Sequence, residues 1–79
     1  MKTIENEDYT WRVRPYSKKE LALAYAPDIS AGAALNRLAQ WINHNTALKQ
    51  ALAEAGYRPS QRMFTSRQTE LIFRYLGAP

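Results

Sequence analysis

The chain has 79 residues, a formal net charge of +4 and no cysteine. A domain of this length buries only about 60% of the surface of its unfolded chain, which leaves little room for a deep cavity or an interdomain cleft. The lack of cysteine excludes disulfides and thiolate zinc sites. The first ten residues lack the basic start and apolar run of a signal peptide, and no apolar stretch reaches the ~18 residues of a membrane span, so we expect a soluble cytoplasmic protein.

Charge is unevenly distributed along the chain. Residues 1–9 carry one lysine and three carboxylates, whereas residues 10–79 carry ten lysines or arginines and four carboxylates. This basic excess favours anionic partners such as nucleic acid, although many proteins with a similar surplus bind none. We predict a flexible acidic tail over residues 1–9 and a single folded domain over residues 10–79.

The domain begins with apolar and basic side chains in alternation. Trp11 and Val13 would face the core from a short strand at about 11–15, with two arginines on its outer face. Pro15 has no N–H for a central strand and would confine this strand to an edge. The arginines would either contact phosphates or keep an exposed edge from pairing with other chains.

Two helices joined by a turn follow this strand. The first, at about 17–26, begins with Ser17 and a glutamate at the spacing of a capping box, and Pro27 ends it. Ser30 caps the second, at about 30–45, along which apolar residues recur at helical spacing. This order is typical of a helix-turn-helix.

The second helix carries the most informative surface. With Leu38 turned inward, helical spacing places three amides near the middle of the opposite face, beside a cationic flank. On a helix in the major groove of DNA, amides can pair with adenine and a guanidinium with guanine. The alternative is an ordinary solvated face, whose polar residues need no specific role. The base-reading candidates are Asn36, Arg37, Gln40 and Asn43.

A third helix and a basic loop come next. The helix, at about 46–55, has the pattern of a structural element and ends at Gly56 as a left-handed residue. Residues 57–64 hold a Pro-Ser turn and an apolar return, which predicts a short hairpin or half-hairpin with a strand at about 62–65. Such a loop would serve as a wing on the DNA backbone or in a minor groove, unless it is an ordinary polar turn. The phosphate-contact candidates are Lys18, Lys19, Arg58 and Arg62.

The last helix, at about 65–76, begins with a second capping box, formed by Thr65 and Gln68. Phe73 falls outside its apolar stripe. It would then be either a contact between the subunits of a homodimer or a single exposed apolar residue with no role. The predicted inner face consists of Gln68, Leu71, Ile72, Tyr75 and Leu76.

The stretches YSKKELA, PDIS, LNRLAQWI, GYR, QRMFT and YLGAP resemble those of a family of small bacterial proteins. That family comes mostly from gut Bacteroides-type anaerobes and is defined as a domain of unknown function. The resemblance covers residues 16–79. It implies a shared fold and a mobile-element context, and it brings no functional residues with it.

More distantly, the order of features resembles the small winged-helix domains of the MerR and phage-excisionase type. The resemblance is carried by YSKKELA, a capped second helix that ends near Trp41-Ile42, GYR and RMFT. In those families the second helix enters the major groove and the wing touches the backbone. This chain departs from them in a longer turn over 25–30 and in the helix at 46–55 before the wing.

The side-chain constellations of catalysis are missing from the sequence. There is no paired-carboxylate site, no Ser–His–Asp or Cys–His set and no glycine-rich phosphate loop, and His44 has no partner at ligand spacing. We predict no enzyme, no cofactor, no metal and no small-molecule substrate.

The leading interpretation is a mainly α, winged helix-turn-helix-like protein that binds double-stranded DNA sequence-specifically. It would be a small transcriptional regulator or a mobile-element accessory factor. The alternative is a protein-interaction module that uses the same scaffold without binding DNA.

Overall fold

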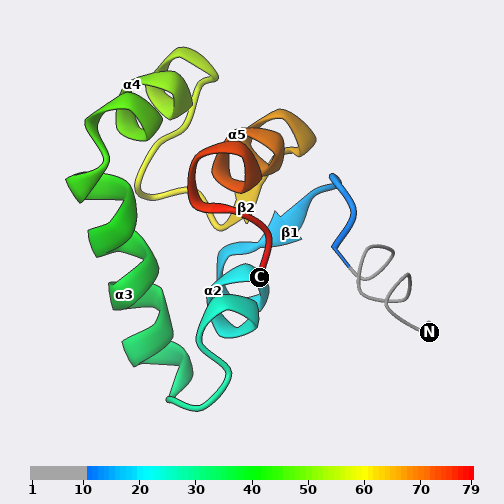
Figure 1. Cartoon of the computed structure of the whole chain (residues 1–79), viewed down its shortest axis with the longest axis vertical. Coiled ribbons are helices and arrows are strands. Elements are labelled where there is room, and N and C mark those ends of the chain that lie inside the picture. The colour runs from blue at the N-terminus through cyan, green and yellow to red at the C-terminus, as the bar shows by residue number, and fades with distance from the viewer. Residues whose placement is uncertain (1–10) are drawn as a thin grey trace.

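The computed structural model describes residues 11–79, and the tail predicted at 1–9 lies outside them. In Figure 1, α3 runs along one side of the molecule and α4 folds back at its end, while α2 and α5 lie across from them. Within the described residues the predicted mainly α fold, with four helices and two short strands, is confirmed, and its layout is compatible with a winged helix-turn-helix. In order, the elements are β1 (Tyr16–Ser17), α2 (Lys18–Tyr25), α3 (Ala31–His44), α4 (Thr46–Glu54), β2 (Met63–Phe64) and α5 (Ser66–Leu76).

Each helix begins at a side chain that accepts a hydrogen bond from an N–H of the first turn, which would otherwise be unpaired. At Thr65 the predicted capping box is complete, because the Gln68 side chain accepts from the Thr65 N–H at 3.1 Å. At Ser17 the cap accepts from the Glu20 N–H at 2.9 Å, whereas the Glu20 carboxylate pairs with Arg14 at 3.3 Å. The four capping residues are Ser17, Ser30, Asn45 and Thr65.

The core lies between the four helices and is crossed by the small sheet. Tyr16 of β1 and Phe64 of β2 are opposite each other in the antiparallel pair, and both rings are fully buried. The Tyr16 hydroxyl donates to the Arg12 carbonyl at 2.8 Å, so its polar atom is paired. Because β1 directly precedes α2 and β2 lies just before α5, the sheet joins the starts of these two helices. The other buried apolar residues are Leu21, Ala22, Ala26, Ala34, Leu38, Ile42, Leu48, Leu52, Leu71 and Ile72.

The strand predicted at about 11–15 is wrong in position. Val13 is 53% exposed, and only Trp11 of the predicted inner pair packs against the core, with its ring 6.3 Å from that of Tyr16. Pairing starts at Tyr16, after Pro15, because proline has no N–H to give to a ladder and the alternating pattern before it meets no partner strand.

The hairpin predicted within 57–64 is also wrong, although β2 falls inside the predicted strand at about 62–65. β2 pairs with β1, which is more than forty positions earlier in the sequence, with Ser17 opposite Met63. The Lys18 N–H extends this pairing by donating to the Arg62 carbonyl at 2.9 Å. The chain before β2 is therefore a loop and not a second strand of a hairpin.

The inner face predicted for α5 needs one correction. Tyr75 is 41% exposed, whereas Phe73 is partly buried and its ring lies 6.2 Å from that of Tyr16. Phe73 and Tyr75 lie on opposite flanks of the apolar stripe of α5. Helical spacing alone does not show which of these flanks packs against β1.

Candidate functional site

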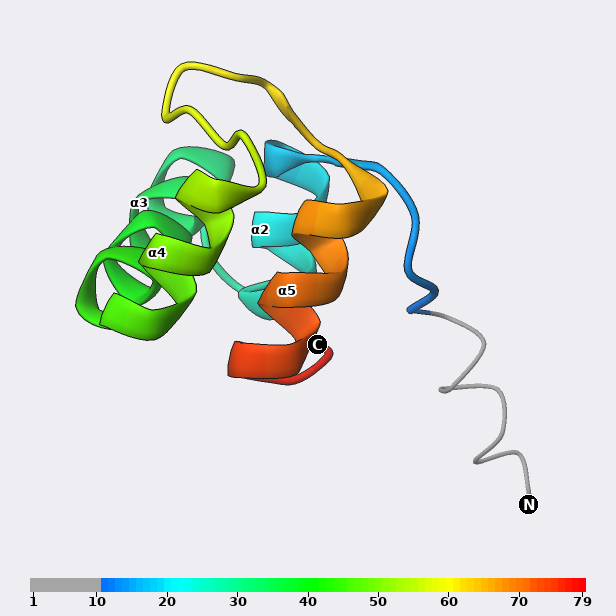
Figure 2. The same ribbon diagram turned by 90° about the horizontal axis from the view of Figure 1, so that it is seen from above.

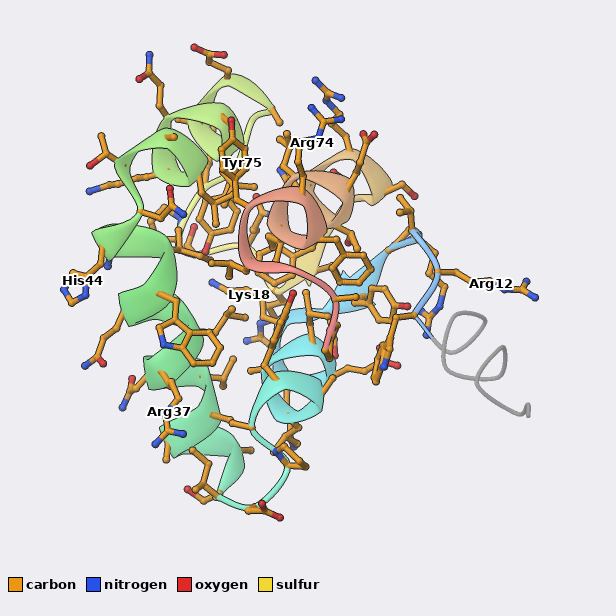
Figure 3. The ribbon with its side chains drawn as sticks, viewed as in Figure 1. Arg12, Lys18, Arg37, His44, Arg74 and Tyr75 are labelled. Carbon is orange, nitrogen blue, oxygen red and sulfur yellow. The ribbon has the colours of Figure 1, made fainter. Side chains whose placement is uncertain are left out.

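One face of α3 is left uncovered by the rest of the described chain. The opposite side of the helix is buried through Ala34, Leu38 and Ile42. Figure 3 shows Arg37 and His44 projecting outward from α3. The four predicted base-reading residues, Asn36, Arg37, Gln40 and Asn43, are all exposed, and α3 contains no carboxylate. The surface of α3 is thus rich in amides and carries positive charge.

The two flanks of this face have different neighbours. Asn36 and Ala39 line a groove that separates α3 from the loop before β2. On the other flank Trp41, 38% exposed, meets the ring of Tyr25 edge to face at 5.8 Å. Helical spacing places Arg37 with Trp41 and Asn43 with Ala39. Asn36 and Asn43 therefore extend toward the loop, whereas Arg37 lies away from it and Gln40 lies between the two flanks.

The chain between α4 and β2, here called the 56–62 loop, starts with a sharp change of direction. Gly56 has a φ of +82°, and the Tyr57 N–H donates to the Leu52 carbonyl at 2.9 Å. The Gly56 N–H donates to the Ala53 carbonyl at 3.0 Å, which completes the predicted left-handed helix ending. Figure 2 shows the loop, in yellow, crossing from the side of α3 and α4 to the side of α2 and α5.

Two glutamine side chains fix the loop from within. The Gln61 amide nitrogen donates to Gln68 Oε1 and to the Met63 carbonyl, both at 2.6 Å, while Gln61 Oε1 accepts from the Arg58 N–H at 2.9 Å. Gln68 is only 2% exposed, and its amide nitrogen donates to the Ala55 carbonyl at 3.1 Å. Because a buried amide is costly unless it is paired, this network holds the loop to both α4 and α5.

Lys18 braces the loop from outside. Its Nζ donates to the Pro59 carbonyl at 2.8 Å and lies 5.3 Å from the centre of the Tyr57 ring, which stacks on Phe64 at 5.7 Å. The charge of Lys18 is therefore partly engaged within the chain. Its predicted role as a phosphate contact stays a prediction.

The groove between the start of α2, α3 and the 56–62 loop has a volume of about 480 Å³. Its floor is mainly apolar, with Leu35 and Tyr57 partly exposed above more deeply buried core residues. Its rim carries Lys18, Lys19, Arg62 and Asn36, and no lining residue is a carboxylate. The structure thus brings three of the four predicted phosphate contacts together with one predicted base reader.

The remaining basic candidates lie elsewhere. Arg58 is exposed on the 56–62 loop but does not line the groove. Arg14 lies 3.8 Å from the centre of the Tyr16 ring and pairs with Glu20, so it belongs to the structure around β1. Arg12 projects on the side of the molecule opposite His44 (Figure 3). These two N-terminal arginines therefore share no surface with α3, and a phosphate that they contacted would lie away from the base-reading candidates.

A smaller hollow of about 370 Å³ lies on the other flank of α3, between Tyr25, Trp41 and the C-terminal residues. The Tyr25 hydroxyl donates to the Gly77 carbonyl. Burial raises the pKa of Tyr25 to about 12, because the phenolate would lose hydration there. This hydroxyl stays protonated at neutral pH and acts as a structural donor.

Phe73, predicted as a subunit contact, contributes instead to packing within the chain through Tyr16. The outward-facing aromatic ring of α5 is that of Tyr75, which is 41% exposed. In residues 11–79 no three histidine, aspartate or glutamate side chains come together as metal ligands would. None of the helices described is long and apolar enough to cross a membrane.

The sequence did not reveal the groove, Ala39 or Tyr57. The groove is built from three segments that are distant in sequence. Its one local signal is Ala39, a small residue that lies one helical turn from Leu35 and one from Ile42. Comparison with known proteins gives one family model, described as Domain of unknown function (DUF4248), which matches residues 12–79. No curated protein and no solved structure matches the chain.

Proposed function

The chain belongs to this family of unknown function, and we propose that it is a sequence-specific double-stranded DNA-binding protein. In this proposal α3 lies in the major groove and the 56–62 loop lies on the adjacent backbone. The protein would be a small transcriptional regulator or a mobile-element accessory factor.

The observation that carries the proposal is the uncovered face of α3. Asn36, Gln40 and Asn43 are exposed on a helix without a carboxylate. Side-chain amides can make two hydrogen bonds to an adenine edge, and the absence of acidic groups removes repulsion from the phosphates. These three residues are proposed to read bases, with Arg37 at the edge of the contact.

Contacts with the DNA backbone are proposed for Lys19, Arg58 and Arg62. Lys18 contributes by holding the 56–62 loop through its hydrogen bond to the Pro59 carbonyl. The glutamine network holds the loop in place before binding, so little conformational entropy is lost when it meets a phosphate. Binding would act by occupancy, since a bound protein blocks or recruits other machinery at its site. A homodimer on a palindromic site is part of this proposal.

A shift assay with mixed-sequence duplex DNA over a series of salt concentrations tests the proposal. We expect binding at low salt that weakens as salt rises, because phosphate contacts release counterions. Selection from random duplexes would then yield a preferred site, and Gln40→Ala would change that preference. Arg12→Ala is the matched control, because Arg12 lies on the other side of the molecule (Figure 3), and it should leave binding unchanged. Absence of salt-dependent binding at low ionic strength would end the proposal.

One observation favours the second candidate, a protein-interaction module without DNA binding. The groove beside α3 has a mainly apolar floor, which a phosphate backbone does not need. A complex with a protein that survives high salt in size-exclusion chromatography, together with no duplex binding, would favour this candidate.

A further inference from the structure

We propose that the groove between α2, α3 and the 56–62 loop docks an acidic peptide segment of a partner protein, one that carries neighbouring large apolar side chains. This inference goes beyond DNA binding and does not depend on it, because its evidence is the floor and rim of the groove. The groove is adjacent to the amide face of α3 and shares Asn36 with the proposed base readers. Its rim also includes Lys18, and Lys19 and Arg62, which are among the proposed DNA backbone contacts.

The floor requires an apolar occupant. Leu35, Ala39 and Tyr57 keep surface exposed there, above the buried side chains of Leu38 and Phe64. The volume of about 480 Å³ is in the range of about 300–1,000 Å³ that is usual for ligand sites. Leucine or phenylalanine side chains would remove this apolar surface from water. A sugar-phosphate backbone would lose hydration over the same floor without gaining hydrogen bonds.

The rim requires negative charge on that occupant. Lys18, Lys19 and Arg62 surround the opening, and no carboxylate lines it to compensate them. Lys19 and Arg62 are exposed and make no ion pair within residues 11–79. Carboxylates that flank the apolar anchors would meet these cations, which favours encounter with an acidic segment and disfavours a basic one.

The groove is formed before any partner binds. One wall is the 56–62 loop, which Lys18 holds through the Pro59 carbonyl and which Gln61 holds through Gln68. The other wall is α3, a regular helix anchored in the core through Leu38. Preformed walls reduce the cost of docking, because no segment of this protein has to become ordered.

The test uses the full chain and three labelled synthetic peptides of equal length. The first has leucine and phenylalanine at helical spacing with aspartate and glutamate at the other positions. The second replaces the apolar residues by alanine, and the third replaces the acidic residues by lysine. We expect fluorescence anisotropy to show the first peptide bound at least about tenfold more tightly than the other two.

Two variants locate the binding. Ala39→Glu fills the groove and places a carboxylate in it, so it should weaken binding of the first peptide by about tenfold or more. Ala47→Glu is the matched control, because Ala47 is exposed on α4 and does not line the groove. Circular dichroism melts should show both variants folded. Backbone amide shifts on addition of the first peptide should be concentrated at Leu35, Ala39 and Tyr57.

Four outcomes would overturn the inference. The first is that the first peptide does not bind at about millimolar concentration, and the second is that the peptide without apolar residues binds equally well. The third is that Ala39→Glu and Ala47→Glu weaken binding equally. The fourth is that another class of molecule occupies the groove. The last would be recognised if duplex DNA, decanoate or a second copy of the chain shifted the same three amides while the peptide did not. Loss of DNA binding alone would leave the peptide result intact, so the two proposals fail separately.

Discussion

The outer faces of α3 and α5 both carry cationic side chains, but they differ in what surrounds those charges. On α5, Arg67 and Arg74 pair with the same carboxylate, that of Glu70, at 3.1 Å and 3.2 Å. On α3, Arg37 lies at the edge of the amide-bearing face, on a helix without a carboxylate. The comparison teaches that positive charge alone does not mark a binding face. In the proposal, the binding face is marked by charge that has no ion-pair partner within residues 11–79 and that lies beside the amides proposed to read bases.

The inner faces of α3 and α5 differ in the kind of side chain that they bury. α5 buries Gln68, whose amide holds the 56–62 loop, whereas α3 buries only apolar residues. In the proposal, α5 therefore shapes the interface by holding the 56–62 loop, and α3 presents it. The experiments below separate these contributions by making matched changes on the two helices.

The largest effect is expected from Gln68→Ala. The substitution leaves the Ala55 carbonyl and the Thr65 N–H without their partners, so the free energy of unfolding should fall by about 2–3 kcal/mol. Gln40→Ala, on the exposed face of α3, is the control and should change stability by less than about 0.5 kcal/mol. Urea unfolding measures both. Equal effects would show that the buried network does not hold the loop.

A smaller loss of stability is expected from Phe73→Ala. Its ring packs on Tyr16 but is only partly buried, so the cost should be about 1–2 kcal/mol, below that of a fully buried phenylalanine. Tyr75→Ala, on the exposed flank of α5, should cost less than about 1 kcal/mol. Sedimentation of both variants tests the homodimer as well. A variant of Phe73 that loses a dimer at unchanged stability would contradict the packing described here.

The next prediction concerns affinity for DNA. Arg58→Ala with Arg62→Ala should weaken binding to all duplexes and make the salt dependence shallower by about one unit for each lost contact. Arg67→Ala with Arg74→Ala removes the same charge from α5, where both arginines are paired, and should have little effect. Shift assays at several salt concentrations measure the difference. Equal losses would mean that net charge, and not the surface around α3, governs binding.

The smallest effect at neutral pH is expected at Tyr25. Its folded pKa of about 12 lies above the ordinary value of 10.0, so the unfolded chain loses this proton more readily. Its contribution to stability is fully present below pH 10 and is lost as the pH rises through about 12. Tyr25→Phe should remove this part of the alkaline decline, as followed by unfolding across that range. An unchanged decline would assign it to other groups.

Local chemistry was sufficient to predict the helices. Ser30 and Thr65 mark helix starts through hydrogen bonds within three residues, and Gly56 marks an end in the same way. The exposed amides of α3 also followed from helical spacing, once the side of Leu38 was taken as buried. These features depend on residues that are close in sequence.

Other features depend on residues that are far apart. The strand pair joins Tyr16 to Phe64, and no local pattern identifies that partner. The same pairing decides that Phe73, and not Tyr75, meets the core. The groove needs α2, α3 and the 56–62 loop together, so its floor and rim appear only in three dimensions.

The most direct test of the central claim is a nuclear magnetic resonance titration of the chain with a mixed-sequence duplex at low salt. The account predicts shifts in the side-chain amides of Asn36, Gln40 and Asn43 and in the backbone of the 56–62 loop, with α5 unaffected. The absence of shifts, or shifts confined to the arginines of α5, would contradict it.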